Sequence, residues 1–305
     1  MDKSVQLNDI NASKPQDRVR NKQSFRQKFN SYLRHPASLA LFLVTALAAL
    51  ITFAVLVFLI VYILINGVPY LTPDFFSWTS NSENVSCVPA IINTLTMTAV
   101  SLIIAVPLGI FAAIYLVEYA PRGNKFVKVI RMTAETLSGI PSIVYGLFGM
   151  MFFSSTLKMG YSLLSGALTL VIMILPLILR TTEEALQTVP DSFREGSFGL
   201  GAGRLRTVFK VVLPSAVPGI LAGVILAIGR IVGETAALLY TSGTNTEIAS
   251  LNSSGETLAL HMYTLSSEGM HTNQAYATAV VLLLIVLVIN TLSAFVAKKL
   301  GSKKS

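Results

Sequence analysis

Arg230 and Glu234 are the two residues of this sequence whose chemistry most needs an explanation, because they lie inside an apolar run. They occur in the segment Gly-Arg-Ile-Val-Gly-Glu-Thr (229–235), within the apolar stretch 217–240. A helix that starts at 217 carries position 230 roughly 20 Å along its axis, where a charge costs about 2.5–3.5 kcal/mol to insert into a membrane. A guanidinium stays charged at any cellular pH, and its fork of donors matches tetrahedral oxyanions. We therefore predict an anion site or gate at Arg230, with Glu234 holding the arginine or serving a proton-sensitive gate.

A buried structural ion pair between helices is the alternative for these two residues. They stand at i and i+4, although arginine before glutamate is the less favourable order along a helix. Gly229 and Gly233 leave room beside them for close helix packing or for a substrate. Arg180, which precedes Thr-Thr-Glu-Glu (181–184), either anchors the cytoplasmic end of a span or adds a second basic group at the cytoplasmic mouth of the anion path.

The polar segment 190–214 separates two apolar runs and is expected to form two short helices joined by glycines. Ser192 and Glu195 match a capping box, which predicts a helix from Phe193. Three glycines then interrupt it: Gly199, Gly201 and Gly203. A second helical stretch follows, with apolar residues at i, i+3, i+4 and i+7: Leu205, Val208, Phe209 and Val212. Pro214 then opens the next span, at a position where its missing N–H does no harm.

This helix–glycine–helix pattern resembles the EAA loop of ABC importer permeases. The family pattern is Glu-Ala-Ala, three residues, Gly, nine residues, Ile, one residue, Leu-Pro. Five positions of this sequence fall at those spacings: Glu195, Gly201, Val211, Leu213 and Pro214. Glycine and serine replace the two alanines, and valine replaces the isoleucine. The resemblance implies a coupling loop over 190–214 whose helices dock in a groove of a cytoplasmic ATPase; an ordinary amphipathic loop on the membrane surface is the alternative.

The composition predicts an all-α polytopic membrane protein. Of 305 residues, 53% are hydrophobic and only 12% are charged, whereas a soluble protein carries about 25% charge. Six apolar runs are long enough to be predicted as spans, at about 39–65, 90–117, 136–153, 163–179, 217–240 and 275–297. The single cysteine, Cys87, excludes a disulfide framework within one chain, and the three histidines show no metal-ligand spacing. We therefore expect this chain to bind no metal and no cofactor.

The basic residues are distributed by side of the membrane. Of the 23 Lys and Arg residues, eight lie in 1–36, four in a loop predicted over 118–134, five in 180–214 and four in 298–305, all in alternate polar segments. By the positive-inside rule both termini are cytoplasmic. The basic excess is thus a topology signal, and we expect no nucleic-acid partner. We predict a disordered basic arm over 1–36 that lies near anionic lipid, a transmembrane permease domain over 37–297 and a cytoplasmic tail over 298–305.

Four segments together look like the A-type permease subunit of Pst-type phosphate ABC transporters: 139–146 (GIPSIVYG), 180–184 (RTTEE), 210–214 (KVVLP) and 229–236 (GRIVGETA). The resemblance covers about 90–297. It implies six transmembrane helices of the type I importer permease fold with a cytoplasmic coupling helix, in a bacterial inner membrane. It also implies half of a phosphate translocation pathway, with Arg230, Glu234 and Arg180 as pathway residues.

The same resemblance implies the partners of such a subunit. These are a sister permease, two ATPase subunits that use ATP and Mg²⁺, and an extracytoplasmic phosphate-binding protein. This chain has no Gly-x-x-x-x-Gly-Lys-Ser/Thr loop, so we expect a transport subunit rather than an enzyme. Two alternatives stay open: a permease of this architecture for another oxyanion, such as sulfate or molybdate, and a self-contained anion channel or secondary transporter.

Overall fold

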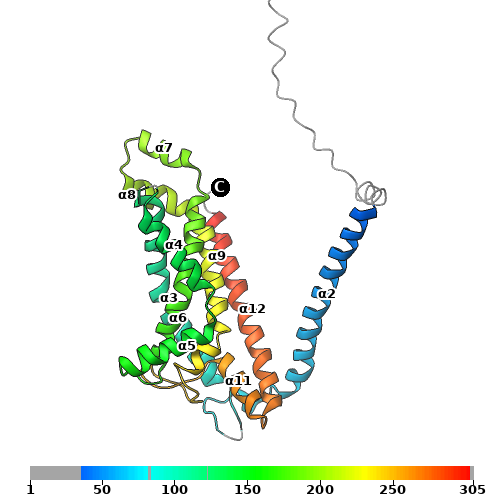
Figure 1. Ribbon diagram of the computed structural model, residues 1–305. Coiled ribbons are helices and arrows are strands. Elements are labelled where there is room, and N and C mark those ends of the chain that lie inside the picture. Colours follow the sequence, from blue (N-terminus) through cyan, green and yellow to red (C-terminus); the bar gives the residue numbers. More distant parts are fainter. Residues whose placement is uncertain (1–35, 82–83, 122, 303–305) are drawn as a thin grey trace, which may run out of the picture. The chain divides into compact units, whose positions relative to one another are not determined.

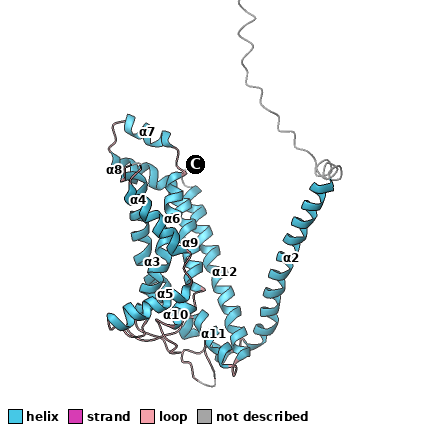
Figure 2. Ribbon diagram, in the orientation of Figure 1, coloured by secondary structure: helices cyan, strands magenta, loops and turns pink. Residues whose placement is uncertain are grey.

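The described residues of the chain, in a computed structural model, are mostly helical and contain no strand (Figure 2). The described ranges are 36–81, 84–121 and 123–302. The predicted arm therefore lies outside them except for Pro36, as do the last three residues of the predicted tail. The chain divides after Ile60 into two compact units, which are considered separately below.

The first unit consists, in its described part, of the N-terminal turns of helix α2 (Pro36–Gly67). This helix has 32 residues, or about 48 Å at 1.5 Å per residue, so it is longer than the roughly 30 Å core of a bilayer. It has no acidic or basic residue in its first or last turn. Apolar residues occupy every face of the helix, which is typical of a span that contacts lipid or other helices on all sides.

The second unit begins with the last turns of α2 and contains all the other elements (Figure 1). They are, in order, η1 (Val68–Tyr70), η2 (Pro73–Phe76), α3 (Val88–Ile114), η3 (Tyr115–Tyr119), α4 (Lys125–Ser138), α5 (Ser142–Gly149), η4 (Met150–Thr156), α6 (Leu163–Gln187), α7 (Asp191–Gly199), α8 (Arg204–Thr207), η5 (Val208–Val212), α9 (Leu213–Val232), α10 (Ala236–Leu239), α11 (Leu258–Glu268) and α12 (Thr272–Ser302).

Helix α6 is the centre of this unit. Its buried residues extend from Leu163 to Leu186, and it packs against both α3 and α9. Two glycines allow the close approach. A Cβ at Gly109 of α3 would lie 2.7 Å from a methyl carbon of Ile178, and one at Gly223 of α9 would lie 2.1 Å from Thr181 Oγ1. Small residues at helix crossings let backbones pack this tightly inside a membrane.

The number of spans agrees with the sequence prediction only if one bent helix pair is included. Among the described residues, five helical segments are long and apolar enough to cross a membrane, and α4 with α5–η4 makes a sixth, bent by 102°. The prediction that 118–134 is a loop was wrong, because residues from Lys125 onward form α4. The bend follows from Pro141, which has an extended backbone (φ −58°, ψ 142°) and cannot donate to the preceding turn.

Helix ends differ from the prediction at two further spans. Helix α6 continues to Gln187, beyond the predicted end at 179, and α12 continues to Ser302, beyond 297. Within the second unit, the C-terminal end of α12 lies at the same end of the helices as α7 and α8, and α5 and α11 lie at the other end (Figure 1). The predicted coupling loop and the C-terminal end of α12 therefore lie at the same end of this unit.

Candidate anion pathway and coupling loop

The predicted continuous span over 217–240 was wrong, and the break falls between the two predicted pathway residues. Helix α9 ends at Val232, Gly233 is its C-cap, and α10 begins only at Ala236. Arg230 therefore lies in the last turn of α9, where a positive charge is favoured by the helix dipole. Two of the three residues between the helices, Gly233 and Thr235, favour such a break, since glycine has little helix propensity and threonine prefers helix ends.

Glu234 is directed toward α10 rather than toward Arg230. Its Oε1 accepts a hydrogen bond of 3.0 Å from the backbone N–H of Ala237, and the residue is only 8% exposed. The carboxylate thus satisfies a free N–H in the first turn of α10, where negative charge is also favoured. No ion pair joins Glu234 to Arg230 in the described chain. The structural ion pair that the i,i+4 spacing allowed is therefore not formed, because the helix ends between the two residues.

Arg230 is half-buried and has no hydrogen-bond or ion-pair partner among the described residues. The space beside it is open: a Cβ at Gly229 would meet no atom within 4 Å. The guanidinium influences Tyr145 of α5 electrostatically. The phenol itself donates to the carbonyl of Leu137 at 2.7 Å, so it leaves the donors of the arginine free. The guanidinium is available to a ligand or to another subunit.

Arg180 lies at a different level of the second unit. Its Nε donates to Glu184 Oε1 at 3.0 Å, one turn along α6, and both side chains are more than half exposed. Since Gly223 of α9 faces Thr181 of α6, Arg230 is seven residues, or roughly 10 Å, farther along α9 than the level of Arg180. The three predicted pathway residues are therefore not gathered into one cluster.

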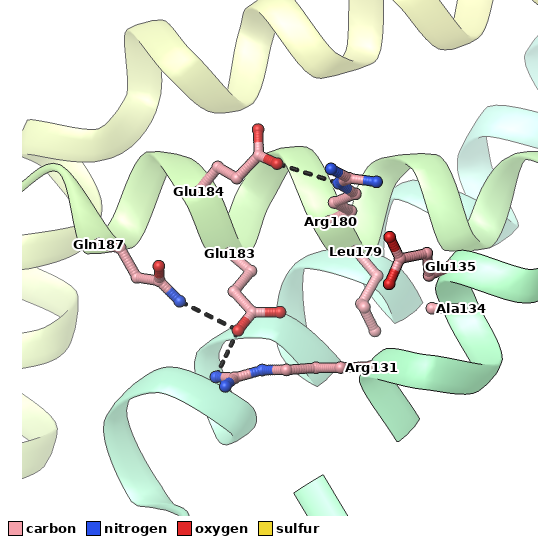
Figure 3. Close-up of a pocket in the computed structure, with 8 residues that line it drawn as sticks. All are labelled: Arg131, Ala134, Glu135, Leu179, Arg180, Glu183, Glu184 and Gln187. Carbon is pink, nitrogen blue, oxygen red and sulfur yellow. Dashed lines mark hydrogen bonds and ion pairs between the residues drawn. The ribbon is translucent and has the colours of Figure 1, made fainter. Parts of the chain in front are cut away.

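A pocket of about 290 Å³ adjoins Arg180, between α4 and α6 (Figure 3). Across it, Arg131 Nη2 of α4 contacts Glu183 Oε1 of α6 at 2.5 Å, and Gln187 donates to the same oxygen at 3.0 Å. Glu135 also lines the pocket. Three carboxylates face two arginines here, so this pocket does not present the excess of positive charge that an anion site needs. Within the described ranges, no group of three or more His, Cys, Asp or Glu side chains is arranged to hold a metal ion.

The coupling loop has the predicted helix–glycine–helix form, with a different N-terminus. Helix α7 begins at Asp191, two residues before the predicted Phe193, and its N-cap is Pro190 without a side-chain cap, so the predicted capping box is not formed. Of the three interrupting glycines, only Gly201 has a positive φ, at +79°. Helix α8 is a single turn that continues through the π-helix η5 into α9.

The five residues of the coupling motif have distinct environments. Glu195 and Gly201 are exposed, and Glu195 has no hydrogen-bond or ion-pair partner among the described residues. Val211, Leu213 and Pro214 are half-buried where η5 joins α9. The predicted apolar face is divided: Val208 and Val212 pack into the core beside α3 and α6, whereas Leu205 and Phe209 are exposed. Three further apolar side chains of the loop are exposed: Phe193, Phe198 and Leu200.

Arg194 of α7 is a contact residue that the sequence analysis missed. Its Nη2 lies 2.7 Å from Glu118 Oε1 at the end of η3, and it also donates to two backbone carbonyls at the end of α6. The sequence does contain a signal for it, because Arg194 directly precedes the motif residue Glu195 and is the only basic residue of α7.

Three comparisons place the chain among known proteins. Residues 105–304 match the family described as binding-protein-dependent transport system inner membrane component. The chain is 39% identical over 242 residues to the probable ABC transporter permease protein YqgI of Bacillus subtilis, covering 73% of this chain and 81% of that protein. It is 34% identical over 256 residues to the phosphate transport system permease protein PstA of Mycobacterium leprae, covering 80% and 83%.

The fold also resembles that of a solved transporter. A chain in the crystal structure of a bacterial alginate ABC transporter, in complex with an alginate pentasaccharide-bound periplasmic protein, matches with a TM-score of 0.66 at 17% identity. The match covers 90% of this chain and 98% of that chain. The family match extends over more than half of the sequence, and this chain belongs to the binding-protein-dependent transport system inner membrane component family, the permease subunits of ABC importers.

Proposed function

We propose that this chain is the membrane-spanning permease subunit of an ATP-driven importer of inorganic phosphate, in which it forms half of the translocation pathway. The proposal is supported by relatives that are named phosphate transport permeases. The observation that carries it physically is Arg230, a guanidinium without a partner in the described chain, beside open space at the end of α9.

The position of Arg230 suits an anion that must bind and then leave. Keeping an arginine within a span costs about 2.5–3.5 kcal/mol, a cost that is reduced where the group faces a water-filled cavity or a partner. All five of its N–H donors are free of described acceptors, so a tetrahedral oxyanion can take two of them side by side. Glu234 accepts a hydrogen bond at the start of α10 and forms no ion pair with Arg230 that would compete with the anion.

We assign the exposed loop 190–214 to coupling with partner ATPase subunits. Its apolar side chains are available to a partner, and Leu200 is 91% exposed. ATP and Mg²⁺ are used by those partners, whereas this chain provides the moving helices. A sister permease completes the pathway, and an extracytoplasmic phosphate-binding protein delivers the anion. The positive-inside rule assigns the loop and both termini to the cytoplasmic side of a bacterial inner membrane.

Uptake of radiolabelled phosphate tests the anion assignment. The assembled complex is reconstituted into proteoliposomes with ATP, and the wild type is compared with R230Q and R230K. We expect phosphate uptake by R230Q to be about tenfold lower than that of the wild type or lower still, since a hydrogen bond to a charged group contributes about 1.5–3 kcal/mol. R230K keeps the charge but loses the fork, so it should fall between the two.

Competition by sulfate and molybdate in the same assay separates phosphate from the other oxyanions. Strong inhibition by either anion would assign a different substrate to the permease. Unchanged phosphate uptake by R230Q in an assembled complex would remove Arg230 from the pathway.

A further inference from the structure

The coupling helix α7 makes few contacts with the rest of the chain. None of its nine residues is buried, and only Arg194 and Ser197 are partly covered. Ser197 Oγ lies 2.8 Å from Thr207 Oγ1, which joins α7 to the next helix of the same loop. Arg194 is therefore the side chain that connects α7 to α3 and α6, whereas Ser197 connects it to the segment that continues into α9.

The guanidinium of Arg194 uses every donor that it has. Its Nε lies 3.2 Å and 3.4 Å from the two carboxylate oxygens of Glu118, and Nη2 donates to Glu118 Oε1 at 2.7 Å. Nη2 also donates to the Leu186 carbonyl at 3.0 Å, and Nη1 donates to the Val189 carbonyl at 2.7 Å and to Asp191 Oδ1 at 3.2 Å. An arginine has five N–H donors in a fixed fork, so none remains for a lipid phosphate or a transported anion.

The acceptors belong to the ends of two membrane helices. Glu118 lies in η3, which continues α3, and its side chain is only 9% exposed. Leu186 and Val189 lie in the last turn of α6 and just after it. The last carbonyls of a helix lack intrahelical partners, and a positive charge there is favoured by the helix dipole. One side chain thus links α7 to α3 and to the buried central helix α6.

We propose that Arg194 is a positioning residue that transmits the movement of the coupling helix to α3 and α6. This inference rests on the proposed function of the chain as an ATP-driven permease. Since α7 buries no residue, apolar packing does not transmit the movement. The contacts of Arg194 to Glu118 and to the two carbonyls fix both the distance of α7 from these helix ends and its orientation relative to them. A lysine provides three donors from a single point and does not reproduce this arrangement.

The test measures coupling rather than activity alone. R194Q, R194K, E118Q and the double variant R194Q/E118Q are purified in the complex with the sister permease, the ATPase subunits and the binding protein. K128Q is the control, because Lys128 of α4 is an exposed basic residue outside the loop 190–214, and its side chain forms no hydrogen bond or ion pair with any described residue. Phosphate taken up per ATP hydrolysed is measured, together with hydrogen exchange of peptides from α7 and α6.

We expect R194Q to lower the phosphate transported per ATP about tenfold, within the range typical of coupling between sites. R194K and E118Q should show smaller decreases, and the double variant should be little worse than R194Q, because both changes remove one contact. Hydrogen exchange should rise in α7 but stay unchanged in the buried part of α6. K128Q should keep the wild-type ratio.

Two results would overturn the proposal. One is a wild-type ratio of phosphate to ATP in R194Q, and the other is an equal loss of uptake and hydrolysis without faster exchange in α7. If R194Q does not assemble, E118Q provides the same test, since it weakens the contact from the opposite side. If even the wild type takes up no phosphate, the proposed substrate fails, while hydrogen exchange and the stimulation of ATP hydrolysis by the binding protein still decide the role of Arg194.

Discussion

Gly223 of α9 lies directly against Thr181 of α6, so that a Cβ on the glycine would be 2.1 Å from Thr181 Oγ1 and 2.6 Å from Thr181 Cβ. Real Cβ atoms do not approach so closely, and the two helices have to separate if this position gains a methyl group. The distance between α6 and α9 therefore depends on the missing side chain at Gly223, and also on that at Gly219, where a Cβ would lie 2.7 Å from Ala185 Cβ.

G223A should destabilise the protein by about 1–3 kcal/mol, the usual cost of overpacking. The matched control is G229A on the same helix, because a Cβ there would meet no atom within 4 Å. Alanine in a helix is favoured over glycine by up to about 1 kcal/mol, so G229A should be neutral or slightly stabilising. Thermal unfolding of the purified protein in detergent measures both; equal midpoints for G223A and wild type would contradict the close packing of α6 and α9.

G201A should change the coupling loop without creating a clash. Gly201 has φ +79°, a conformation that costs a residue with a Cβ roughly 1–2 kcal/mol, although no atom lies within 4 Å of the position. We expect the turn between α7 and α8 to rearrange and the phosphate transported per ATP to decrease.

Gly203 provides the control for that substitution. Its φ is −72° and its surroundings are equally open, so G203A should keep normal coupling. If G201A and G203A transport the same amount of phosphate per ATP, the left-handed turn has no part in coupling.

Cys87 should be almost unreactive in the folded protein. It is fully buried before α3, and this burial raises the pKa of its thiol from 9.0 to about 12. The thiolate is the reactive form, and the raised pKa keeps the thiol protonated at neutral and mildly alkaline pH. Maleimide labelling should therefore be negligible at pH 7–9 and rise only on unfolding. Rapid labelling of the native protein would show that the segment before α3 opens.

Because Cys87 does not react, a single introduced cysteine can be labelled without background, and its labelling measures whether that position is accessible to water. R230C should be labelled by a small charged maleimide reagent from water, because the site beside Gly229 is open. A cysteine at 230 that reacts only with membrane-permeant reagents would indicate that the position faces lipid.

N93A should release the segment between α10 and α11. Asn93 is fully buried in α3 and hydrogen-bonds to the Glu247 carbonyl at 3.0 Å, the Glu256 carbonyl at 3.2 Å and the Ala249 N–H at 3.0 Å. Leaving buried polar groups without partners costs about 1–3 kcal/mol each, so hydrogen exchange of residues 244–257 should increase strongly. N93D keeps only the acceptor contact to Ala249 and should show much of the same increase. Wild-type protection in both variants would contradict this role.

The sequence predicted the parts of the fold that depend on composition and on local backbone chemistry. Long apolar runs indicated the spans, and the glycines between 199 and 203 indicated the turn of the coupling loop. Residues 118–134 were misassigned because four basic residues obscured an amphipathic pattern; Val127 of α4 is buried, while Lys125 and Lys128 on other faces are exposed.

The missed and corrected features depend on contacts between distant residues. Arg194 and Glu118 are 76 residues apart, and no local pattern pairs them. The direction of Glu234 depends on where α9 ends, which a count of apolar residues over 217–240 does not reveal. Arg230 could be singled out because a charge within a span is rare. That it forms no ion pair with Glu234 could be recognised only from the course of the backbone, which shows that α9 ends between the two residues.

The end of α9 has a consequence for how firmly an anion is held. Arg230 lies at the negative pole of that helix, so its charge already offsets the helix dipole before any substrate arrives. An oxyanion that binds the guanidinium, as proposed, brings its own negative charge toward the same pole and is partly repelled by it. This repulsion lowers the affinity of the site for the anion, so the anion dissociates more easily, as transport requires.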